Sequence, residues 1–443
     1  MGMGVDFPDR SPQGIASVIA RLITAGELAP GDRLPTVRDL AAELLVSPAT
    51  VSAAWQALAR SGMIQSRGRA GTFVRGMPRE WLTRRVKGLS SADGDWRLDL
   101  SLGTPDPALL PSLADAFSHV TLRADTGRYH DLPVLPELAA LLERAWPAHA
   151  EAITVVNGAV DGISRTLGQV VRLGDRVAVE SPGFPYFLDL LDALGAEAVP
   201  LSLDDEGVEP ASLAHALTQR PTAVILQPRA QNPTGASMSE ERARLLAAVV
   251  RASRDGHRVV VIEDDHSGLI SMAPDVTLGR WLPGQVVHVR SFSKSHGPDL
   301  RIAALGGPAR LVERIVARRM LGPGWTSRLI QTVLLDMLTD PGAVAAVRAA
   351  RLAYRDREEA LVTALRREGV SMPHPDGINL WLPVADDRAA IVHLAAAGIA
   401  VAGGAPFVVH DDTPHVRVTS GVVAADAVDV ARELAAASRA VRR

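Results

Sequence analysis

Apolar runs alternate with helical patterns along the chain from about residue 150 onward. Five short runs rich in Val, Ile, Leu and Ala are separated, in most cases, by stretches with helical spacing. This alternation is typical of a mainly parallel β-sheet covered by helices. The runs lie at residues 153–156, 176–179, 223–226, 259–262 and 286–289. We therefore predict a large α/β domain, to which we assign residues 99–443.

The first part of the chain shows helical periodicity instead. An apolar stripe predicts a first helix that stops near Gly26, and Thr36 with Asp39 has the spacing of a capping box at the start of a second helix. Ser47 can cap a third helix, with Pro48 at its first position. Two short helices joined by a tight turn form a helix-turn-helix, whose second helix can lie in the major groove of DNA. The stripe of the first helix is Ile15, Val18, Ile19, Leu22 and Ile23.

A β-hairpin is predicted after these helices. Residues 63–65 and 72–74 read as its strands, and the segment between them is basic and contains glycine. Such a tip would form a wing beside the DNA backbone. The pattern alone fits equally well a small helical domain that binds protein or only packs. We assign residues 10–76 to this module, and residues 77–98, which mix Pro, Gly, Ser and charges, to a linker.

Composition narrows the possible classes of protein. The chain has no cysteine, which excludes disulfides, thiolate metal sites and a cysteine nucleophile, and we expect no metal. Its net charge is −3, so a role with nucleic acid would have to be local to one module. No apolar run reaches the roughly 18 residues of a membrane span, and the N-terminus lacks the shape of a signal peptide. We expect a cytoplasmic protein without a membrane partner.

Polar and small residues gather where the predicted strands end. In such folds, ligands bind at the carboxyl ends of the strands. Each group taken singly also fits a turn, a helix cap or a solvated loop, but their recurrence after successive strands favours one shared binding site. The groups are Asn157-Gly158-Ala159, the turn that presents Phe184, the loop with Asn232, the run Glu263-Asp264-Asp265-His266, and the stretch from Ser291 to Arg301.

Lysine is nearly absent from the chain. Of 47 Lys and Arg residues, only Lys87 and Lys294 are lysines. An arginine cannot lose its proton in a protein, whereas a lysine amine can. Lys294 is therefore a candidate for amine chemistry, most obviously a Schiff base with an aldehyde. On composition alone, an ordinary surface charge is an equally good interpretation.

Together, the strand-end residues fit pyridoxal 5'-phosphate (PLP). Lys294 would form the Schiff base, and a carboxylate under the ring nitrogen would keep that nitrogen protonated, which makes the ring an electron sink. Small residues at the start of a helix let backbone N–H groups approach a phosphate, and arginine suits bidentate contact with it. The phosphate would be held by Arg301, Ser291, Ser293 and the backbone at Gly158 and Ala159.

The N-terminal residues closely resemble the winged helix-turn-helix of GntR-type bacterial regulators. The family commonly has arginine directly after the serine of the third helix, where this chain has Pro48, so base specificity does not carry over. The resemblance rests on Pro30-Gly31-Asp32-Arg33-Leu34-Pro35-Thr36-Val37-Arg38-Asp39-Leu40-Ala41, Val46-Ser47-Pro48-Ala49-Thr50-Val51 and Gly71-Thr72-Phe73-Val74. It implies phosphate or base contacts for Arg38, Ser47, Thr50, Arg67 and Arg69.

Residues 99–443 strongly resemble fold-type I aminotransferases. The specific signatures are Asn232-Pro233-Thr234-Gly235 and Ser291-Phe292-Ser293-Lys294 with Leu300-Arg301. Most aminotransferases have tyrosine where this chain has His266, which favours cofactor binding over efficient transamination. The resemblance implies that Asp264 pairs with the pyridine nitrogen, Asn232 and His266 contact the ring hydroxyl, Phe184 stacks on the ring, Arg417 binds a carboxylate, and Tyr129 reaches the phosphate of the partner subunit in a homodimer.

A GntR-like module followed by an aminotransferase-like body is the layout of MocR-type regulators. The resemblance implies a PLP-dependent regulator that binds double-stranded DNA and senses PLP or an amino compound. The alternative is a working PLP-dependent aminotransferase with an accessory DNA-binding module. A third interpretation is a DNA-binding protein whose body serves only for dimerisation, which the survival of Lys294 disfavours.

Overall fold

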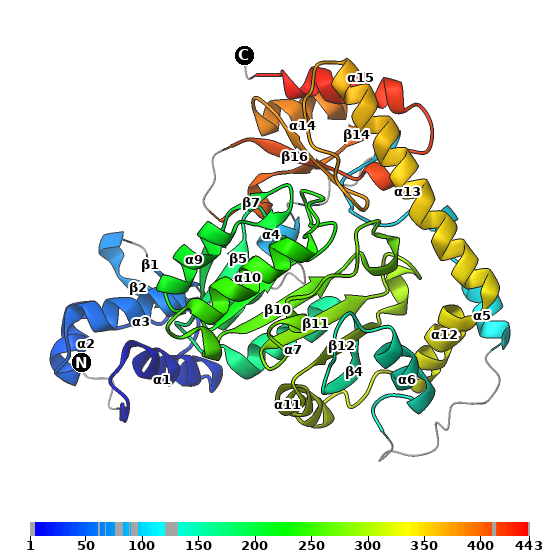
Figure 1. Cartoon of the computed structure of the whole chain (residues 1–443). Coiled ribbons are helices and arrows are strands. Elements are labelled where there is room, and N and C mark those ends of the chain that lie inside the picture. The colour runs from blue at the N-terminus through cyan, green and yellow to red at the C-terminus, as the bar shows by residue number, and fades with distance from the viewer. Residues whose placement is uncertain are drawn as a thin grey trace.

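The computed structural model describes residues 5–60, 63–66, 68–75, 83–87, 89, 96–119, 132–409 and 413–441 (Figure 1). A small N-terminal module, residues 5–75, lies beside a much larger body, residues 96–441. The fold class expected from the sequence is confirmed for both parts.

The N-terminal module consists of helices and a hairpin around one apolar core. Ser47 accepts a hydrogen bond from the backbone N–H of Thr50 (3.1 Å), and Thr36 accepts one from that of Asp39 (3.2 Å), so both predicted caps are confirmed. Arg33 forms a β-bridge with Phe73, which ties the hairpin to the segment before the second helix. The elements are α1 (Pro12–Thr24), α2 (Val37–Leu44), α3 (Pro48–Arg60), β1 (Ile64–Ser66) and β2 (Thr72–Val74).

The body is built on a seven-stranded sheet in the order β4-β12-β11-β10-β9-β5-β6. Strand β12 is antiparallel to both of its neighbours, and the other strands run parallel, so the predicted mainly parallel sheet is confirmed. All five predicted runs are strands, and the sequence prediction missed β6 and β12. The strands are β4 (Ala152–Val156), β5 (Arg176–Glu180), β6 (Glu197–Leu201), β9 (Ala223–Leu226), β10 (Val260–Asp265), β11 (Val286–Ser291) and β12 (Ala303–Gly307).

Helices cover both faces of this sheet. Side chains alternate along a strand, so Val260 and Ile262 pack on one face while Val261 packs on the other. The face of Ile262 is covered by α7 (Ala159–Val170), α8 (Pro185–Leu194) and α11 (Ala309–Met320). The face of Val261 is covered by α9 (Pro210–Thr218) and α10 (Glu240–Ala252). The same alternation decides which face receives each polar side chain near the strand ends.

A smaller C-terminal subdomain packs above the sheet (Figure 1). Its strands β13, β16 and β15 form an antiparallel sheet that shares a core with α13 and α15. The remaining elements are α5 (Leu113–His119), α6 (Pro136–Arg144), α12 (Arg328–Thr339), α13 (Pro341–Arg367), α14 (Asp387–Ala396), α15 (Ala427–Ser438), β7 (Leu203–Asp204), β8 (Gly207–Val208), β13 (Leu380–Pro383), β14 (Ile399–Ala400), β15 (Ala402–Gly403) and β16 (His415–Val418).

The connection between module and body makes its own contacts. Helix α4 (Arg84–Lys87) packs on α8, and strand β3 (Leu98–Asp99) pairs in parallel with β14, so Leu98 is already part of the body. Leu173, in the turn between α7 and β5, packs against the apolar core of the N-terminal module. The two parts are therefore joined by a packed contact as well as by the linker.

Among the described helices, no single helix is long and apolar enough to cross a bilayer. The pair α12 and α13 passes by length and composition, with a bend of 74° between the two helices.

Candidate functional site

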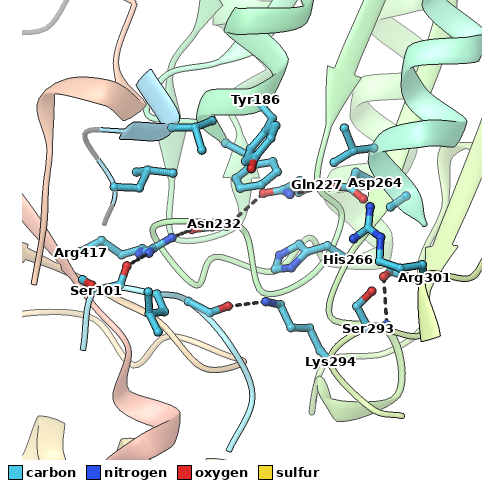
Figure 2. Close-up of a pocket in the computed structure, with 18 residues that line it drawn as sticks. Ser101, Tyr186, Gln227, Asn232, Asp264, His266, Ser293, Lys294, Arg301 and Arg417 are labelled. Carbon is cyan, nitrogen blue, oxygen red and sulfur yellow. Dashed lines mark hydrogen bonds between the residues drawn. The ribbon is translucent and has the colours of Figure 1, made fainter. Parts of the chain in front are cut away.

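A cavity of about 350 Å³ lies at the carboxyl ends of β9, β10 and β11 (Figure 2). Its wall includes residues from the large sheet, from the C-terminal subdomain and from the linker. Most of the predicted cofactor residues meet here. The lining residues are Val86, Leu89, Ser101, Leu102, Gly103, Ala159, Val160, Phe184, Tyr186, Gln227, Asn232, Asp264, His266, Ser291, Ser293, Lys294, Arg301 and Arg417.

Two adjacent carboxylates at the end of β10 have opposite environments. Asp264 shares the strand face of Ile262 and lines the cavity, whereas Asp265 points to the other face, where Arg229 and Arg290 bind it at 2.7 and 3.1 Å. Burial raises the pKa of Asp264 to about 7. Burial also opposes ionisation of Asp265, but the charge of Arg229 and hydrogen bonds and charges from His288 and Arg290 hold its pKa well below the usual range. Only Asp264 is available to a ligand.

Gln227 positions Asp264. Its side-chain Nε2 donates to Oδ2 of Asp264 (2.7 Å), and its Oε1 accepts from the backbone N–H of Asn232 (2.8 Å). Among the described residues, no group donates to the buried Oδ1 of Asp264. One carboxylate oxygen is thus fixed by the protein, and the other is left as an acceptor in the cavity.

Lys294 reaches into the cavity from the loop after β11. Its amine donates to the carbonyl oxygen of Gly103, and Figure 2 shows it facing the same space as His266. Desolvation, together with the positive charge of Arg417, lowers the pKa of Lys294 to about 8, and the charge of Asp264 acts in the opposite direction. A substantial share of the amine is therefore neutral near physiological pH, as a nucleophile requires.

His266 has one ring nitrogen committed to the backbone. Its Nε2 lies 2.7 Å from the carbonyl oxygen of Ala230, to which an Nε2–H donates. Burial and the charge of Lys294 lower the pKa of His266 to about 4, so the ring is neutral and carries a single proton. In this tautomer, Nδ1 is an acceptor. The ring therefore cannot donate from Nδ1, as the hydroxyl of a tyrosine would.

The predicted phosphate-binding residues surround the start of α7. Gly158 has φ of 93°, and a Cβ at this position would lie 3.3 Å from the guanidinium of Arg301. Glycine is therefore required for the close approach of Arg301 to the backbone. Ser291 accepts a hydrogen bond from the backbone N–H of Ser293 (3.2 Å), and both serines line the cavity near Arg301, as does Ala159. The group combines a guanidinium, hydroxyls and a helix N-terminus, which suits an anion.

The other predicted cavity residues come from opposite walls. Phe184 stacks on Tyr186 with 5.1 Å between ring centroids, at the start of α8. Arg417, on β16, is 2% exposed. It donates to the carbonyl oxygen of Ser101 and, at 3.5 Å, to Oδ1 of Asn232. A buried guanidinium beside Asn232 is suited to bind a carboxylate.

The predicted DNA-contacting residues lie on the N-terminal module. Arg38 is exposed in the first turn of α2, and Ser47 and Thr50 exchange a hydrogen bond (2.8 Å) at the start of α3. Arg69 lies in the short 3₁₀ turn between β1 and β2, with its side chain outside the described set. Arg67 and Tyr129 lie outside the described residues.

The sequence prediction missed several residues of the cavity. Gln227 could have been identified from the sequence, because it is the first polar residue after the buried strand β9. Gly103 and Ser101 contribute backbone carbonyls, and Val86 and Leu89 come from the linker. No local pattern marks these four residues, since their approach depends on how distant segments pack.

The comparisons with known proteins agree with this architecture. The family described as "Aminotransferase class I and II" matches residues 97–433, and "Bacterial regulatory proteins, gntR family" matches residues 13–74. The Salmonella typhimurium protein named vitamin B6 salvage pathway transcriptional repressor PtsJ is 38% identical over 407 residues, covering 90% of this chain and 92% of that protein. The regulator TauR of Rhodobacter capsulatus is 30% identical over 444 residues, covering 89% and 88%.

Solved structures support the fold of the body. The kynurenine aminotransferase of Pyrococcus horikoshii is 20% identical with a TM-score of 0.69, covering 81% of this chain and 96% of that chain. The chain belongs to the MocR-type transcription regulators, in which a GntR winged helix-turn-helix precedes an aminotransferase class I and II domain.

Proposed function

We propose that this regulator binds double-stranded DNA through its N-terminal module and holds PLP in the cavity of its body. The observation that carries the proposal is the presence, in one chain, of a winged helix-turn-helix and a cavity where Lys294 accompanies a fixed Asp264. PtsJ is named for vitamin B6 salvage, which supports a vitamin B6 compound as the effector. An amino compound that reacts with bound PLP is the other candidate effector.

The residues of the cavity fit PLP. The free Oδ1 of Asp264 needs a donor, and a protonated pyridine nitrogen is one. The Gly158 and Arg301 group suits the phosphate, and the faces of Phe184 and Tyr186 offer an aromatic wall. When bound, PLP supplies an aldehyde for amines and an electron sink conjugated to it.

Each of these cavity residues has its own proposed role. Lys294 would offer a partly neutral amine for covalent attachment, and Asp264 would keep a proton on the ring nitrogen through Oδ1. Asn232 and His266 would contact the ring hydroxyl of PLP, with His266 as an acceptor through Nδ1. Arg417 is placed to bind the carboxylate of an amino acid, because its guanidinium is buried in the cavity wall.

DNA binding is assigned to Arg38, Ser47, Thr50, Arg67 and Arg69. Arginine contacts to phosphate would make the affinity salt-dependent, and contacts to base edges would add sequence preference. We take residues 10–76, 77–98 and 99–443 as the DNA-binding, linker and PLP-binding parts, with Leu98 paired to the last of them. The proposed DNA binding supports a cytoplasmic location.

We further propose a homodimer in which Tyr129 reaches the phosphate of the partner's cofactor. A dimer would bring two N-terminal modules to two half-sites on DNA. PLP would act through its different affinity for two arrangements of the modules.

A working aminotransferase is the second candidate function. Asn232, Asp264, Lys294 and Arg417 meet in one cavity, which favours retained chemistry. The committed Nε2 of His266 counts against rapid turnover, because the donor that a tyrosine provides is missing. Steady conversion of an amino acid and a 2-oxo acid would support this function, whereas a single half-reaction would not.

The cofactor assignment is tested by covalent trapping. Borohydride treatment of the PLP-loaded protein should add one cofactor mass to the peptide that contains Lys294, and the K294A variant should lose it. The K87R variant is the matched control and should label like the wild type. Absence of label on Lys294, with PLP in excess, would refute the cofactor half of the proposal.

The DNA half is tested on the gene's own upstream region. Fluorescence anisotropy at several salt concentrations should show sequence-selective binding that weakens with salt, and PLP should change the affinity by about 5-fold or more. Equal affinity for an unrelated duplex of the same length would contradict a specific regulator. Genome-wide mapping of bound sites would then name the controlled genes.

A further inference from the structure

The linker contributes to the wall of the cavity. We use the name strap for its described residues, 83–87 and 89, which include helix α4. Val86 is 8% exposed, and it lines the cavity together with Leu89, whose backbone N–H donates to the carbonyl oxygen of Val86 at 3.0 Å. Figure 1 shows α4 at the centre of the body, apart from the N-terminal module. The described part of the segment that connects the module to the body thus lies at the wall of the cavity.

A latch of charged side chains holds the strap on α8. The guanidinium of Arg85 contacts the carboxylate of Asp189 (3.0 Å) and that of Asp192, and the hydroxyl of Thr83 donates to Asp189. The Asp189 side chain is only 9% exposed. A carboxylate so shielded interacts more strongly with its partner than an exposed one would.

The latch and the aromatic wall share one helix. Tyr186, Asp189 and Asp192 follow each other at intervals of three residues, so they lie along one side of α8. Tyr186 lines the cavity, and the two aspartates hold Arg85. A ligand that packs against Tyr186 therefore lies next to the latched strap.

The cavity keeps about 350 Å³ with the strap seated, within the range of small-molecule sites. A ligand can consequently bind without displacing the strap and would add apolar contacts to Val86 and Leu89. We propose that a ligand at Lys294 holds the strap on α8, and that this contact transmits occupancy of the cavity to the N-terminal module. The inference rests on the proposed function and names the element that couples its two halves.

Hydrogen exchange of the full-length protein tests the strap directly. Adding PLP should slow exchange of the backbone amides of residues 84–89 by about 3-fold or more, because bound ligand favours the seated state. In the R85Q variant this protection should be lost, and the effect of PLP on DNA affinity should fall to less than about 2-fold. The R176Q variant is the matched control, since Arg176 makes an exposed ion pair with Glu197 elsewhere on the body.

Three further variants guard against indirect effects. D189N should lose part of the protection that R85Q loses, because Arg85 keeps its contact with Asp192. The double variant R85Q/D189N should resemble R85Q, because the Arg85–Asp189 contact is already lost in that single variant. V86S leaves the latch charges in place and should weaken the protection by PLP. Additive losses in the double variant would contradict a shared latch.

The outcomes separate this inference from the proposed function. If PLP shows no absorbance change and no label on Lys294, the proposed function fails. If PLP binds and changes DNA affinity while residues 84–89 exchange at the same rate, the strap is not the coupling element and only the inference is overturned. PLP binding that leaves both the strap and DNA affinity of the wild type unchanged would overturn the coupling altogether.

Discussion

At position 266, the hydrogen bond of one ring nitrogen limits what the side chain can donate to a ligand in the cavity. The Nε2 of His266 is bound to Ala230, and burial keeps the imidazole neutral. The departure from tyrosine at this position could be identified from the sequence. The direction of this hydrogen bond can be assigned only from the position of the Ala230 carbonyl oxygen. No local sequence pattern reveals that position.

Replacing His266 with tyrosine should increase transamination. The tyrosine hydroxyl would donate to the ring oxygen of PLP, and a neutral hydrogen bond contributes about 0.5–1.5 kcal/mol, or up to about 10-fold in rate. Single-turnover absorbance changes with an amino acid would measure the half-reaction. The H266F variant is the control, because phenylalanine fills similar space without a donor. Equal rates in H266Y and H266F would contradict this role.

Attachment of PLP to Lys294 should depend on pH. Only the neutral amine attacks the aldehyde, and the pKa of Lys294 is lowered to about 8. The second-order rate of attachment should therefore rise as pH increases through about 8 and then level off. The R417M variant should shift the midpoint upward, because the positive charge of Arg417 contributes to the lowered pKa. An unchanged midpoint in R417M would show that desolvation alone sets it.

At the scale of elements, α2 and α3 form the surface that we expect to meet DNA. Arg38 is exposed on α2, close in sequence to the Thr36 cap that starts the helix. R38A should weaken DNA binding for all sequences alike and reduce the slope of log affinity against log salt by about 1, because one phosphate contact is lost. R21A is the control, since Arg21 is exposed on α1 in the same module. A loss confined to one sequence would instead indicate base readout.

Most elements could be predicted from the sequence, and the failures have physical causes. The caps at Thr36 and Ser47 and the five apolar runs depend on local spacing, which a sequence carries directly. Strand β6 contains Pro200, and β12 contains Gly306 and Gly307, residues that weaken the local signal for a strand. Both strands form because their neighbours in the sheet provide pairing partners.

At the scale of the whole molecule, the residues of the candidate site could be predicted where they lie at the ends of strands that are consecutive along the chain and also neighbours in the sheet. Asn232 and Lys294 follow strands β9 and β11, and Asp264 lies at the end of β10, which is the neighbour of both strands. Arg417 and Gly103 come from segments that reach the cavity only through the packing of the C-terminal subdomain. The resemblance identified Arg417, whereas nothing local identified the carbonyl of Gly103 or the linker residues.

Packing of Leu173 against the N-terminal module should couple the unfolding of the two halves. This side chain belongs to the body but packs into the core of the N-terminal module, and Gln13 of α1 lies against the neighbouring Gly174. Full burial of a leucine contributes about 1.5–3 kcal/mol, and the partly buried Leu173 contributes a share of this, so melting of one half should remove support from the other. Differential scanning calorimetry should show one transition for the wild type and two for L173S. A change in the arrangement of the module would therefore have to break or shift the packing around Leu173.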